Sequence, residues 1–510
     1  MGGAPDFDLL VIGGGINGAG VARDAAGRGL RVLLCEQGDL AGATSSASSK
    51  LIHGGLRYLE HYGFRLVRES LAEREVLLRI APHLVWPLQF VLPQGPHTRP
   101  GWMLRAGLFL YDHLAGRRQL GGSRAVALAP DRYGAALKPA ITRGFTYWDC
   151  WGEDARLVIA NVQDAGERGA SVRVRTRVVG LDANGGAWHA RLQDDAGRPS
   201  VVTARAVVNA AGPWVGQVLE AAPDVKSHYA VRLVKGSHIV LPRLYPGDHA
   251  FLLQNDDGRV VFMIPFERRY TLVGTTDVPI DGDPAAARCT DDEAQYLCRA
   301  VNAVLAQPVR PAAAVWRFSG VRPLFDDGTG DPSRVTRDYV LETVTAAGAP
   351  MTSVFGGKLT SYRSLAERVL AELKPFFPGL GPGWTRDAAL PGGDLPKDGV
   401  EGLAARLREA HPGLPAEWLD AVAQRYGSRA QRVVGDARSA DDLGERFTPR
   451  LYAREVAYLV EHEWARSADD VLWRRTREGL ACDERAREAV TRFLAGWQRA
   501  ATAVEAECAR

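Results

Sequence analysis

Residues 8–18 read Asp8-Leu9-Leu10-Val11-Ile12-Gly13-Gly14-Gly15-Ile16-Asn17-Gly18. The apolar run is typical of a buried parallel strand, and the small residues after the glycines favour a helix from Ala19 to Arg28. In such a turn, Gly13 permits the sharp bend, Gly15 lets a pyrophosphate approach the backbone, and Gly18 allows the helix to pack closely on the sheet. The segment therefore predicts an α/β fold with a phosphate group at the N-terminus of the helix.

A second strand, residues 31–36, follows the helix and completes a strand–helix–strand unit. It ends at Glu36, about twenty residues after the glycines, where a carboxylate accepts hydrogen bonds from a ribose. We interpret the unit as a dinucleotide site. The alternative is a glycine-rich turn in some other doubly wound fold. No second fingerprint follows a later strand, so we predict no separate NAD site beside a flavin.

Two later segments are typical of flavin contacts. Residues 206–214 form an apolar strand that ends in a turn with Gly212 and Trp214. Residues 355–360 place a Gly-Gly-Lys turn before a helix, whose positive end would stabilise the negative charge that a reduced flavin carries. Either segment alone reads equally well as an ordinary loop. Together with the N-terminal unit they favour FAD over other dinucleotides.

Length and composition limit the remaining possibilities. A chain of 510 residues predicts two or three domains, and a net charge of +3 argues against a dedicated nucleic-acid binder. Six cysteines without a C-x-x-C pair predict neither disulfides nor a zinc site and fit a reducing cytoplasm. His462-Glu463 lacks the second histidine of a metalloprotease motif, so we predict no metal. Apolar runs are shorter than the ~20 residues that a spanning helix needs, so any membrane contact would be peripheral.

The rest of the chain divides by pattern. We expect strands at 171–179, 187–193 and 201–209 in a meander, β-rich segments from 229 to 275, a strand at 351–355 and a helix at 360–374. Residues 83–150 read as irregular except for one amphipathic stretch, and residues 375–396 read as a linker rich in Pro and Gly. Helical spacing at Val456, Leu459 and Val460 predicts a C-terminal helical domain, with a capping box at 467–470.

Several motifs then occur in one order: residues 44–59 (TSSASSKLIHGGLRYL), 235–238 (KGSH), 274–277 (GTTD), 319–323 (SGVRP), 336–339 (TRDY) and 355–363 (FGGKLTSYR). In this order the chain closely resembles the aerobic, FAD-dependent glycerol-3-phosphate dehydrogenases, from near residue 8 into the C-terminal region. The resemblance implies a glutathione-reductase-like fold of the D-amino-acid-oxidase type, with a β-rich substrate cap and a helical domain. The implied domains are FAD-binding at 1–82, 151–228 and 318–380, cap at 83–150 and 229–317, and helical at 390–510.

The resemblance also implies a reaction: sn-glycerol 3-phosphate is oxidised to dihydroxyacetone phosphate, and the electrons pass through non-covalent FAD to quinone. The implied cofactor contacts are Gly13, Gly15, Asn17, Gly18, Glu36, Thr44, Ser45, Ser49, Lys50, Leu51, His53, Gly212, Trp214, Gly357, Lys358, Leu359 and Thr360.

Phosphate binding needs fixed cations, and Arg57, Arg322, Arg337 and Lys358 are the candidates in the matching motifs. His238 is the candidate base for the hydroxyl proton, although Arg322 would serve equally to stabilise a developing alkoxide. Arg322 and Lys358 are expected closest to the reacting end. Tyr58 and Thr275 are expected to complete the pocket by hydrogen bonding. A lone histidine on a strand is more often structural, so the role of His238 depends on the motif match.

Residues 99–118 carry the pattern of a surface helix, with Trp102, Met103, Ala106, Phe109, Leu110, His113 and Leu114 on one face and arginines nearby. Either this face packs on the cap, or it contacts an anionic membrane surface on the inner side of the cell membrane, as the resemblance implies. A homodimer is the commonest assembly for such a chain. Three rivals remain: a soluble oxidase that uses oxygen, a flavoenzyme for another hydroxy or amino acid, and a non-catalytic flavin-binding scaffold.

Overall fold

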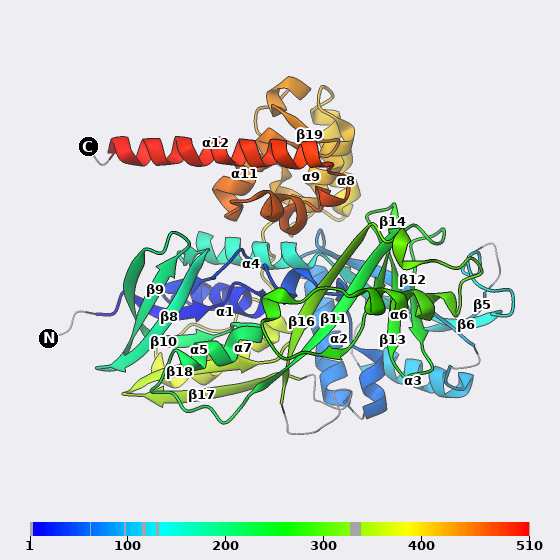
Figure 1. Ribbon diagram of the computed structural model, residues 1–510, viewed down its shortest axis with the longest axis horizontal. Helices are drawn as coiled ribbons and strands as arrows, with labels where there is room; N and C mark the ends of the chain where they lie inside the picture. The colour runs from blue at the N-terminus through cyan, green and yellow to red at the C-terminus, as the bar shows by residue number, and fades with distance from the viewer. Residues whose placement is uncertain are drawn as a thin grey trace.

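The computed structural model describes residues 4–61, 63–95, 98–114, 119–128, 132–326 and 338–508, without the side chains of 60, 61, 498 and 500–508. Two sheets lie side by side in the larger part of the molecule, and a helical part lies across one end of them (Figure 1). The five cysteines whose side chains are described are free thiols.

The first sheet has β1 at its centre, in the order β17-β18-β10-β1-β2-β7, and β8 and β9 extend it as a hairpin beside β10. Residues of β1 alternate between two buried layers: Leu9 and Val11 pack with α1, α4 and α7, and Leu10 and Ile12 pack on the other face with Trp188. The predicted buried parallel strand is therefore confirmed, because β1 pairs in parallel with both β2 and β10. Its members are β1 (Phe7–Ile12), α1 (Ile16–Gly27), β2 (Val32–Cys35), α4 (Asp154–Glu167), β7 (Ser171–Arg173), β8 (Thr176–Asn184), β9 (Ala187–Asp194), β10 (Pro199–Asn209), α5 (Val215–Glu220), β17 (Val340–Ala346), β18 (Ala349–Phe355) and α7 (Tyr362–Leu373).

One expected strand of this sheet is wrong. Residues 171–179 do not form a single strand, because Arg175 adopts a positive φ of 51° and breaks it. The first piece, β7, pairs in parallel with β2, and the second piece, β8, turns into the antiparallel meander β8–β9–β10. The kink places Arg175 beside the segment that follows β2, since its backbone nitrogen donates to the carbonyl of Gly38.

The second sheet follows the order β15-β11-β14-β13-β12-β4-β6-β3, with β16 on β11 and β5 on β6. Residues 83–150 are not irregular, since β4 pairs with β6 along its whole length. The strands were hidden because β4 carries Pro87 and has buried residues on both faces, so neither alternation nor composition marks it. The elements are β3 (Leu51–Ile52), α2 (Phe64–Ile80), β4 (Val85–Pro93), α3 (Gly101–Leu114), β5 (Arg124–Ala127), β6 (Arg143–Gly152), β11 (Val231–Pro242), β12 (Ala250–Gln254), β13 (Val260–Phe266), β14 (Tyr270–Gly274), β15 (Val278–Pro279), α6 (Asp291–Asn302) and β16 (Trp316–Phe325).

The strand β16 lies in the second sheet, although most of its residues fall in a segment that the sequence assigns to the FAD-binding domain. This strand pairs with β11 over ten positions, so the start of the segment 318–380 lies in the second sheet, whereas β17 and β18 lie in the first. The chain thus passes from one sheet to the other between residues 325 and 340.

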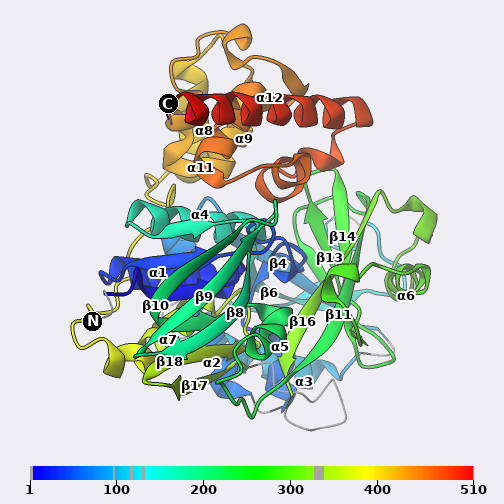
Figure 2. The ribbon, with the colours of Figure 1, turned by 60° about the vertical axis from the view of Figure 1, so that its left-hand side comes forward.

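The C-terminal part is a group of helices with its own apolar core, built around Trp418, Leu419, Val456 and Leu459. Figure 2 shows it lying over α4 and the near end of the second sheet, with the long helix α12 on the outside. The predicted capping box is present: the Ser467 hydroxyl accepts from the Asp470 nitrogen, and the Asp470 carboxylate accepts from the Ser467 nitrogen. It opens a π-helical turn, η9 (Asp470–Arg475), among α8 (Gly399–Ala410), α9 (Ala416–Tyr426), α10 (Ala430–Val434), β19 (Arg446–Thr448), β20 (Leu451–Tyr452), α11 (Ala453–Glu463) and α12 (Glu484–Cys508).

Candidate flavin and substrate site

The glycine turn after β1 has no room for side chains at its two outer positions. A Cβ on Gly13, whose φ is 109°, would lie 2.6 Å from the carbonyl oxygen of Ala210, and one on Gly18 would lie 1.9 Å from that of Gly13. Beside Gly15 the nearest atom is the Ser45 hydroxyl, 3.2 Å from an added Cβ. The Ser45 hydroxyl also accepts a hydrogen bond from the Ile16 nitrogen at 3.0 Å. The open side of Gly15 therefore faces the positive end of α1, as phosphate binding requires.

Glu36 lies directly after β2 and next to this turn. Its carboxylate accepts hydrogen bonds from the backbone nitrogens of Gly14, at 2.6 Å, and Gly38, at 2.7 Å. Burial raises the pKa of Glu36 above its ordinary value, while the two backbone hydrogen bonds act in the opposite direction. The predicted contact of Glu36 with a ribose stays a prediction.

The loop between β18 and α7 meets the N-terminus of α1. Asn17 donates its side-chain nitrogen to the carbonyl of Gly356 at 3.2 Å, and a Cβ on Gly357, whose φ is 107°, would lie 2.6 Å from that nitrogen. On the same side of the loop, the His53 nitrogen donates to the Thr360 hydroxyl at 3.1 Å. The side-chain oxygen of Asn17 is buried and has no hydrogen-bond partner among the described residues. A buried polar atom of this kind, beside the open glycine turn, fits a polar cofactor lying between α1 and this loop.

Two cations of the predicted substrate site lie next to this loop. The Lys358 ammonium lies 4.0 Å from the centre of the Tyr58 ring. Arg322, on β16, pairs with the carboxylate of Asp277 and donates to the Thr275 hydroxyl at 2.9 Å. The backbone segments that carry the two cations lie next to each other, because a Cβ on Gly356 would lie 3.6 Å from the carbonyl oxygen of Pro323, the residue after Arg322. Arg57 lies in the short helical turn that precedes α2 and is partly exposed, and Arg337 lies outside the described residues.

His238 lies on β11, paired in register with Gly274 and Phe318. Its Nε2 lies 2.9 Å from the Ser49 hydroxyl, and its ring stacks on that of Phe318 at 4.8 Å between centroids. Burial, together with the nearby cations of Arg322 and Lys50, lowers the pKa of His238 to about 3. The imidazole is therefore neutral at physiological pH, which is the form that accepts a proton.

Lys50 is a predicted cofactor contact whose side chain is buried within the protein. Its ammonium is buried and donates to both carboxylate oxygens of Asp154, at 2.9 and 2.7 Å, and to the carbonyl of Ser46 at 2.9 Å. All three of its N–H donors are used within the protein, so a contact with the cofactor would come from the Lys50 backbone. The Thr44 hydroxyl likewise donates to the carbonyl of Val321 at 2.5 Å.

Three carboxylates that support these residues were not predicted. Asp277 pairs with Arg322, Asp154 pairs with Lys50, and Asp39 lies between Glu36 and the serine-rich segment, residues 44–49. A signal existed for Asp277, since it closes the motif 274–277 that carries Thr275. Nothing in the sequence marked Asp154, which is 104 positions from Lys50.

A cleft of about 340 Å³ opens beside the serine-rich segment, against β16 and the helical part. One wall is aromatic, since Trp316 stacks on Trp473 at 4.4 Å and packs against Phe318 at 4.5 Å. Trp214, a predicted cofactor contact, and the cation of Arg474 also line it.

Comparison with known proteins identifies the family. Residues 8–363 match the family model described as FAD dependent oxidoreductase, and residues 384–501 match the C-terminal domain of alpha-glycerophosphate oxidase. The chain is 53% identical to a glycerol-3-phosphate dehydrogenase of Pseudomonas aeruginosa, over 93% of this chain and 92% of that protein. The chain belongs to the FAD-dependent glycerol-3-phosphate dehydrogenase family. The suspected family is thereby confirmed, and its cofactor is FAD.

Close relatives of this chain are named for different phosphorylated substrates. The chain is also 49% identical to a D-erythritol 1-phosphate dehydrogenase of Brucella abortus, over 96% of this chain and 97% of that protein. Among solved structures, the glycerol-3-phosphate dehydrogenase of Bacillus halodurans complexed with FAD superposes with a TM-score of 0.72 at 26% identity, covering 97% of this chain and 94% of that one. The predicted FAD-binding α/β fold of the D-amino-acid-oxidase type, with a C-terminal helical domain, is confirmed.

Proposed function

We propose that this chain oxidises sn-glycerol 3-phosphate to dihydroxyacetone phosphate and passes the electrons to membrane quinone. The observation that carries the proposal is the pair of cations, Arg322 and Lys358, next to the loop that meets the cofactor turn at Asn17. A phosphorylated alcohol needs such cations for its phosphate and a neighbouring base for its hydroxyl proton. This arrangement also speaks against the scaffold alternative.

Bound FAD supplies a two-electron acceptor for the hydride that leaves C2 of the alcohol. Arg322, Thr275, Lys358 and Tyr58 bind and orient the substrate, together with Arg57 and Arg337. We propose His238 as the group that takes the hydroxyl proton as the carbonyl forms; its low pKa in the free protein makes it a weak base there, so the step requires substrate binding to raise that pKa. Arg322 is the alternative group at this step, since a guanidinium stabilises the developing alkoxide.

A second candidate substrate is D-erythritol 1-phosphate, favoured by the 49% identical relative of that name. Both substrates present a phosphate and an adjacent alcohol, so the cations alone do not separate them. Anaerobic addition of each substrate to the FAD-loaded protein, followed by steady-state kinetics, makes the choice. We expect a higher kcat/KM for glycerol 3-phosphate than for D-erythritol 1-phosphate or unphosphorylated glycerol. A preference for the four-carbon substrate would overturn the assignment.

Quinone as acceptor is tested by reoxidation. After reduction by substrate, we expect fast reoxidation by a short-chain quinone and slow reoxidation by oxygen in stopped flow. The reverse order would favour the soluble oxidase alternative. Whichever acceptor reacts faster, bleaching of the flavin by substrate in the absence of an acceptor would exclude a non-catalytic scaffold.

Helix α3 supports a peripheral position at the inner face of the cell membrane. Its buried side consists of Leu104, Leu108 and Tyr111, whereas Trp102 is 72% exposed and Phe109 is 57% exposed. The predicted apolar face therefore does not pack on the cap, and exposed aromatic side chains of this kind insert readily into a lipid surface. Among the described residues, no helix is long and apolar enough to cross a membrane. A homodimer remains a prediction.

A further inference from the structure

The segment between β2 and β3, residues 36–50, carries five of the predicted cofactor contacts, and we call it the flavin segment. It is tied to the glycine turn at its start, because the Ala41 nitrogen donates to the carbonyl of Gly14 at 3.0 Å and Glu36 accepts from the Gly14 nitrogen. Asp39 lies between these two contacts and is buried. A displacement of Asp39 would therefore be transmitted to Gly14 and Glu36, on which the nucleotide end of the cofactor depends.

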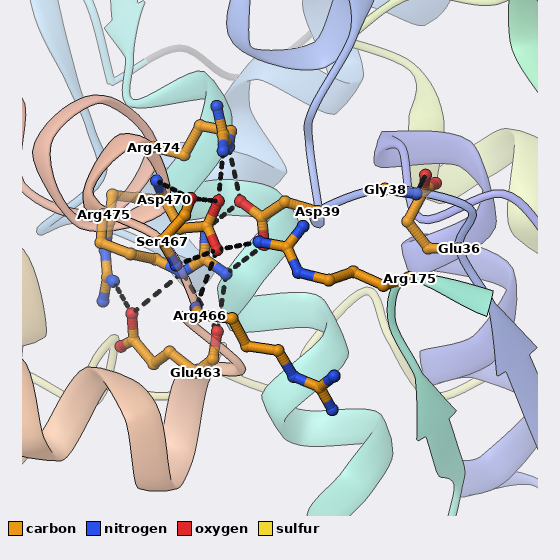
Figure 3. A network of polar contacts seen from close by, with 11 residues as sticks. Glu36, Gly38, Asp39, Arg175, Glu463, Arg466, Ser467, Asp470, Arg474 and Arg475 are labelled. Carbon is orange, nitrogen blue, oxygen red and sulfur yellow. Dashed lines mark hydrogen bonds and ion pairs between the residues drawn. The ribbon is translucent and has the colours of Figure 1, made fainter. Parts of the chain in front are cut away.

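The partners of Asp39 come from the helical domain. Arg475 donates to both carboxylate oxygens of Asp39, at 2.9 and 2.8 Å, and Arg474 donates from Nε at 2.5 Å (Figure 3). The Arg475 side chain is completely buried and also donates to the carbonyl of Glu463 at 2.7 Å. Arg474 in turn pairs with Asp470, which accepts from Arg175 on the kink between β7 and β8. The cluster thus connects η9 with the flavin segment through charge-assisted hydrogen bonds of fixed geometry.

A second connection reaches the other end of the flavin segment. Arg477, two residues beyond Arg475, donates to Glu153 at 2.9 Å and lies 3.4 Å from the carboxylate of Asp154. Asp154 is the partner of Lys50, and it also accepts from the Ser48 hydroxyl at 2.8 Å. Both ends of the flavin segment are therefore linked to residues 474–477 of the helical domain, at one end directly and at the other through Asp154.

Docking alone does not require such a cluster. A domain interface is held as well or better by apolar side chains, because burying charges has a large desolvation cost, and buried ion pairs are best attested where a particular geometry must be specified. The arginines also project from a π-helical turn, a rare backbone form that is frequent at functional sites. Their target is a loop that carries predicted cofactor contacts at both ends.

We infer that Arg474 and Arg475 are positioning residues for FAD, which hold Asp39 so that the flavin segment keeps its cofactor-binding shape. The helical domain thereby completes the cofactor site from outside the two sheets. The inference depends on FAD as the cofactor and on the proposed contacts of the flavin segment, and it does not depend on which alcohol is oxidised.

The chain provides a matched control for this cluster. Arg429 of the helical domain forms a two-pronged ion pair with Glu167 at the end of α4, at 2.6 and 2.5 Å. This pair also joins the helical domain to the larger part of the molecule through an arginine and a carboxylate; it is more exposed than the Asp39 cluster, and it does not contact the flavin segment. Arg429→Met therefore removes a docking contact without disturbing Asp39.

The experiment measures FAD affinity by titrating apoprotein with FAD and following the quenching of flavin fluorescence. We expect Arg475→Met and Arg474→Met to raise the dissociation constant of FAD roughly tenfold or more, since each leaves a buried carboxylate short of donors. Arg429→Met is expected to change it less than about twofold. Arg475→Met removes a completely buried cation, so the fold of this variant is checked by circular dichroism. Arg474 is partly exposed, so Arg474→Met and Arg474→Lys are milder changes. Arg474→Lys, which keeps the charge, is expected to recover part of the affinity.

Thermal unfolding of the apoproteins separates positioning from stability. If the Arg474 and Arg475 variants unfold at lower temperature and yet bind FAD as wild type does, the cluster is only a docking contact and the inference is wrong. An equal loss of FAD affinity in Arg429→Met would also overturn it, because general loosening of the domain would then explain the effect. Substrate oxidation is not used as a readout, so a failure here is distinct from a failure of the proposed activity.

Discussion

The Ser49 hydroxyl lies 2.9 Å from Nε2 of His238. This contact joins the flavin segment to the middle of β11 in the second sheet, and it is the most direct link between the predicted base and the cofactor side of the site. The other ring nitrogen of His238 is buried without a hydrogen-bond partner among the described residues. Among the described residues, Ser49 is therefore the hydrogen-bond partner of the His238 ring, which Phe318 also orients by stacking.

Replacing Ser49 by Ala is expected to lower kcat roughly tenfold, because the buried imidazole loses its partner. Ser49→Thr keeps a hydroxyl and is expected to retain most of the activity. The measurement is kcat per bound FAD in the two variants. A loss of FAD with normal kcat for the remainder would instead assign the hydroxyl to the cofactor, as the sequence motif predicts.

The low pKa of His238 predicts a pH dependence of stability. Its folded-state pKa of about 3 lies below the ordinary 6.5, so the unfolded chain takes up a proton first as the pH falls. The stability associated with the neutral imidazole is complete above pH 6.5 and is lost between there and the folded pKa, at about 1.4 kcal/mol per pH unit. Urea unfolding of apoprotein at several pH values tests this against His238→Gln. We expect the wild type to lose stability relative to the variant below pH 6.5, and a constant difference would contradict the lowered pKa.

Arg322 predicts a specific effect on substrate binding. Arg322→Met is expected to raise KM for glycerol 3-phosphate roughly ten- to a hundredfold, as loss of a charged hydrogen bond does, with little change in FAD content. The control is Arg317→Met on the same strand, whose guanidinium pairs with the exposed Asp291. Similar KM values for the two variants would remove Arg322 from the substrate site.

Helix α3 predicts membrane binding through its exposed aromatic residues. Trp102→Ser/Phe109→Ser is expected to reduce co-flotation with vesicles that contain anionic lipid at least severalfold, because most of the insertable apolar surface of the helix is removed. The control is Val201→Ser/Val315→Ser, which removes exposed apolar side chains from β10 and from the residue before β16. Flotation equal to that of the control would exclude α3 as the membrane contact.

The elements that the sequence predicted are those with strictly local causes. The strand, glycine turn and helix at residues 7–27 follow from buried apolar periodicity and from the space that Gly13 and Gly18 leave free. The β-strands between 231 and 274 and the helix at 362–373 were also correctly predicted. By contrast, β4 was missed because Pro87 and burial on both faces hide a strand, and the break at Arg175 depends on the packing of two different strand partners.

The site residues also divide into those that a local motif marks and those that only the fold brings together. Motifs identified His238, Arg322 and Lys358 as candidates, but the buried carboxylates that pair with other cations of the site were out of reach of a single sequence. Asp154 and Asp39 are ordinary acidic residues in the chain, and only the fold brings them to Lys50 and Arg475. The use of a lysine or an arginine side chain is fixed by its partner, and the Lys50 ammonium forms an ion pair inside the protein.

The ion pair of Asp39 and Arg475 connects positions that are 436 residues apart. Because synthesis runs from the N-terminus, Asp39 leaves the ribosome early, and its cationic partners follow only when nearly the whole polypeptide exists. Until then the strand–helix–strand unit has its glycine turn but an uncompensated carboxylate beside it. If Arg474 and Arg475 position FAD as inferred, the cofactor site is completed late, and a chain that ends before Arg474 is expected to hold FAD more weakly than the full chain.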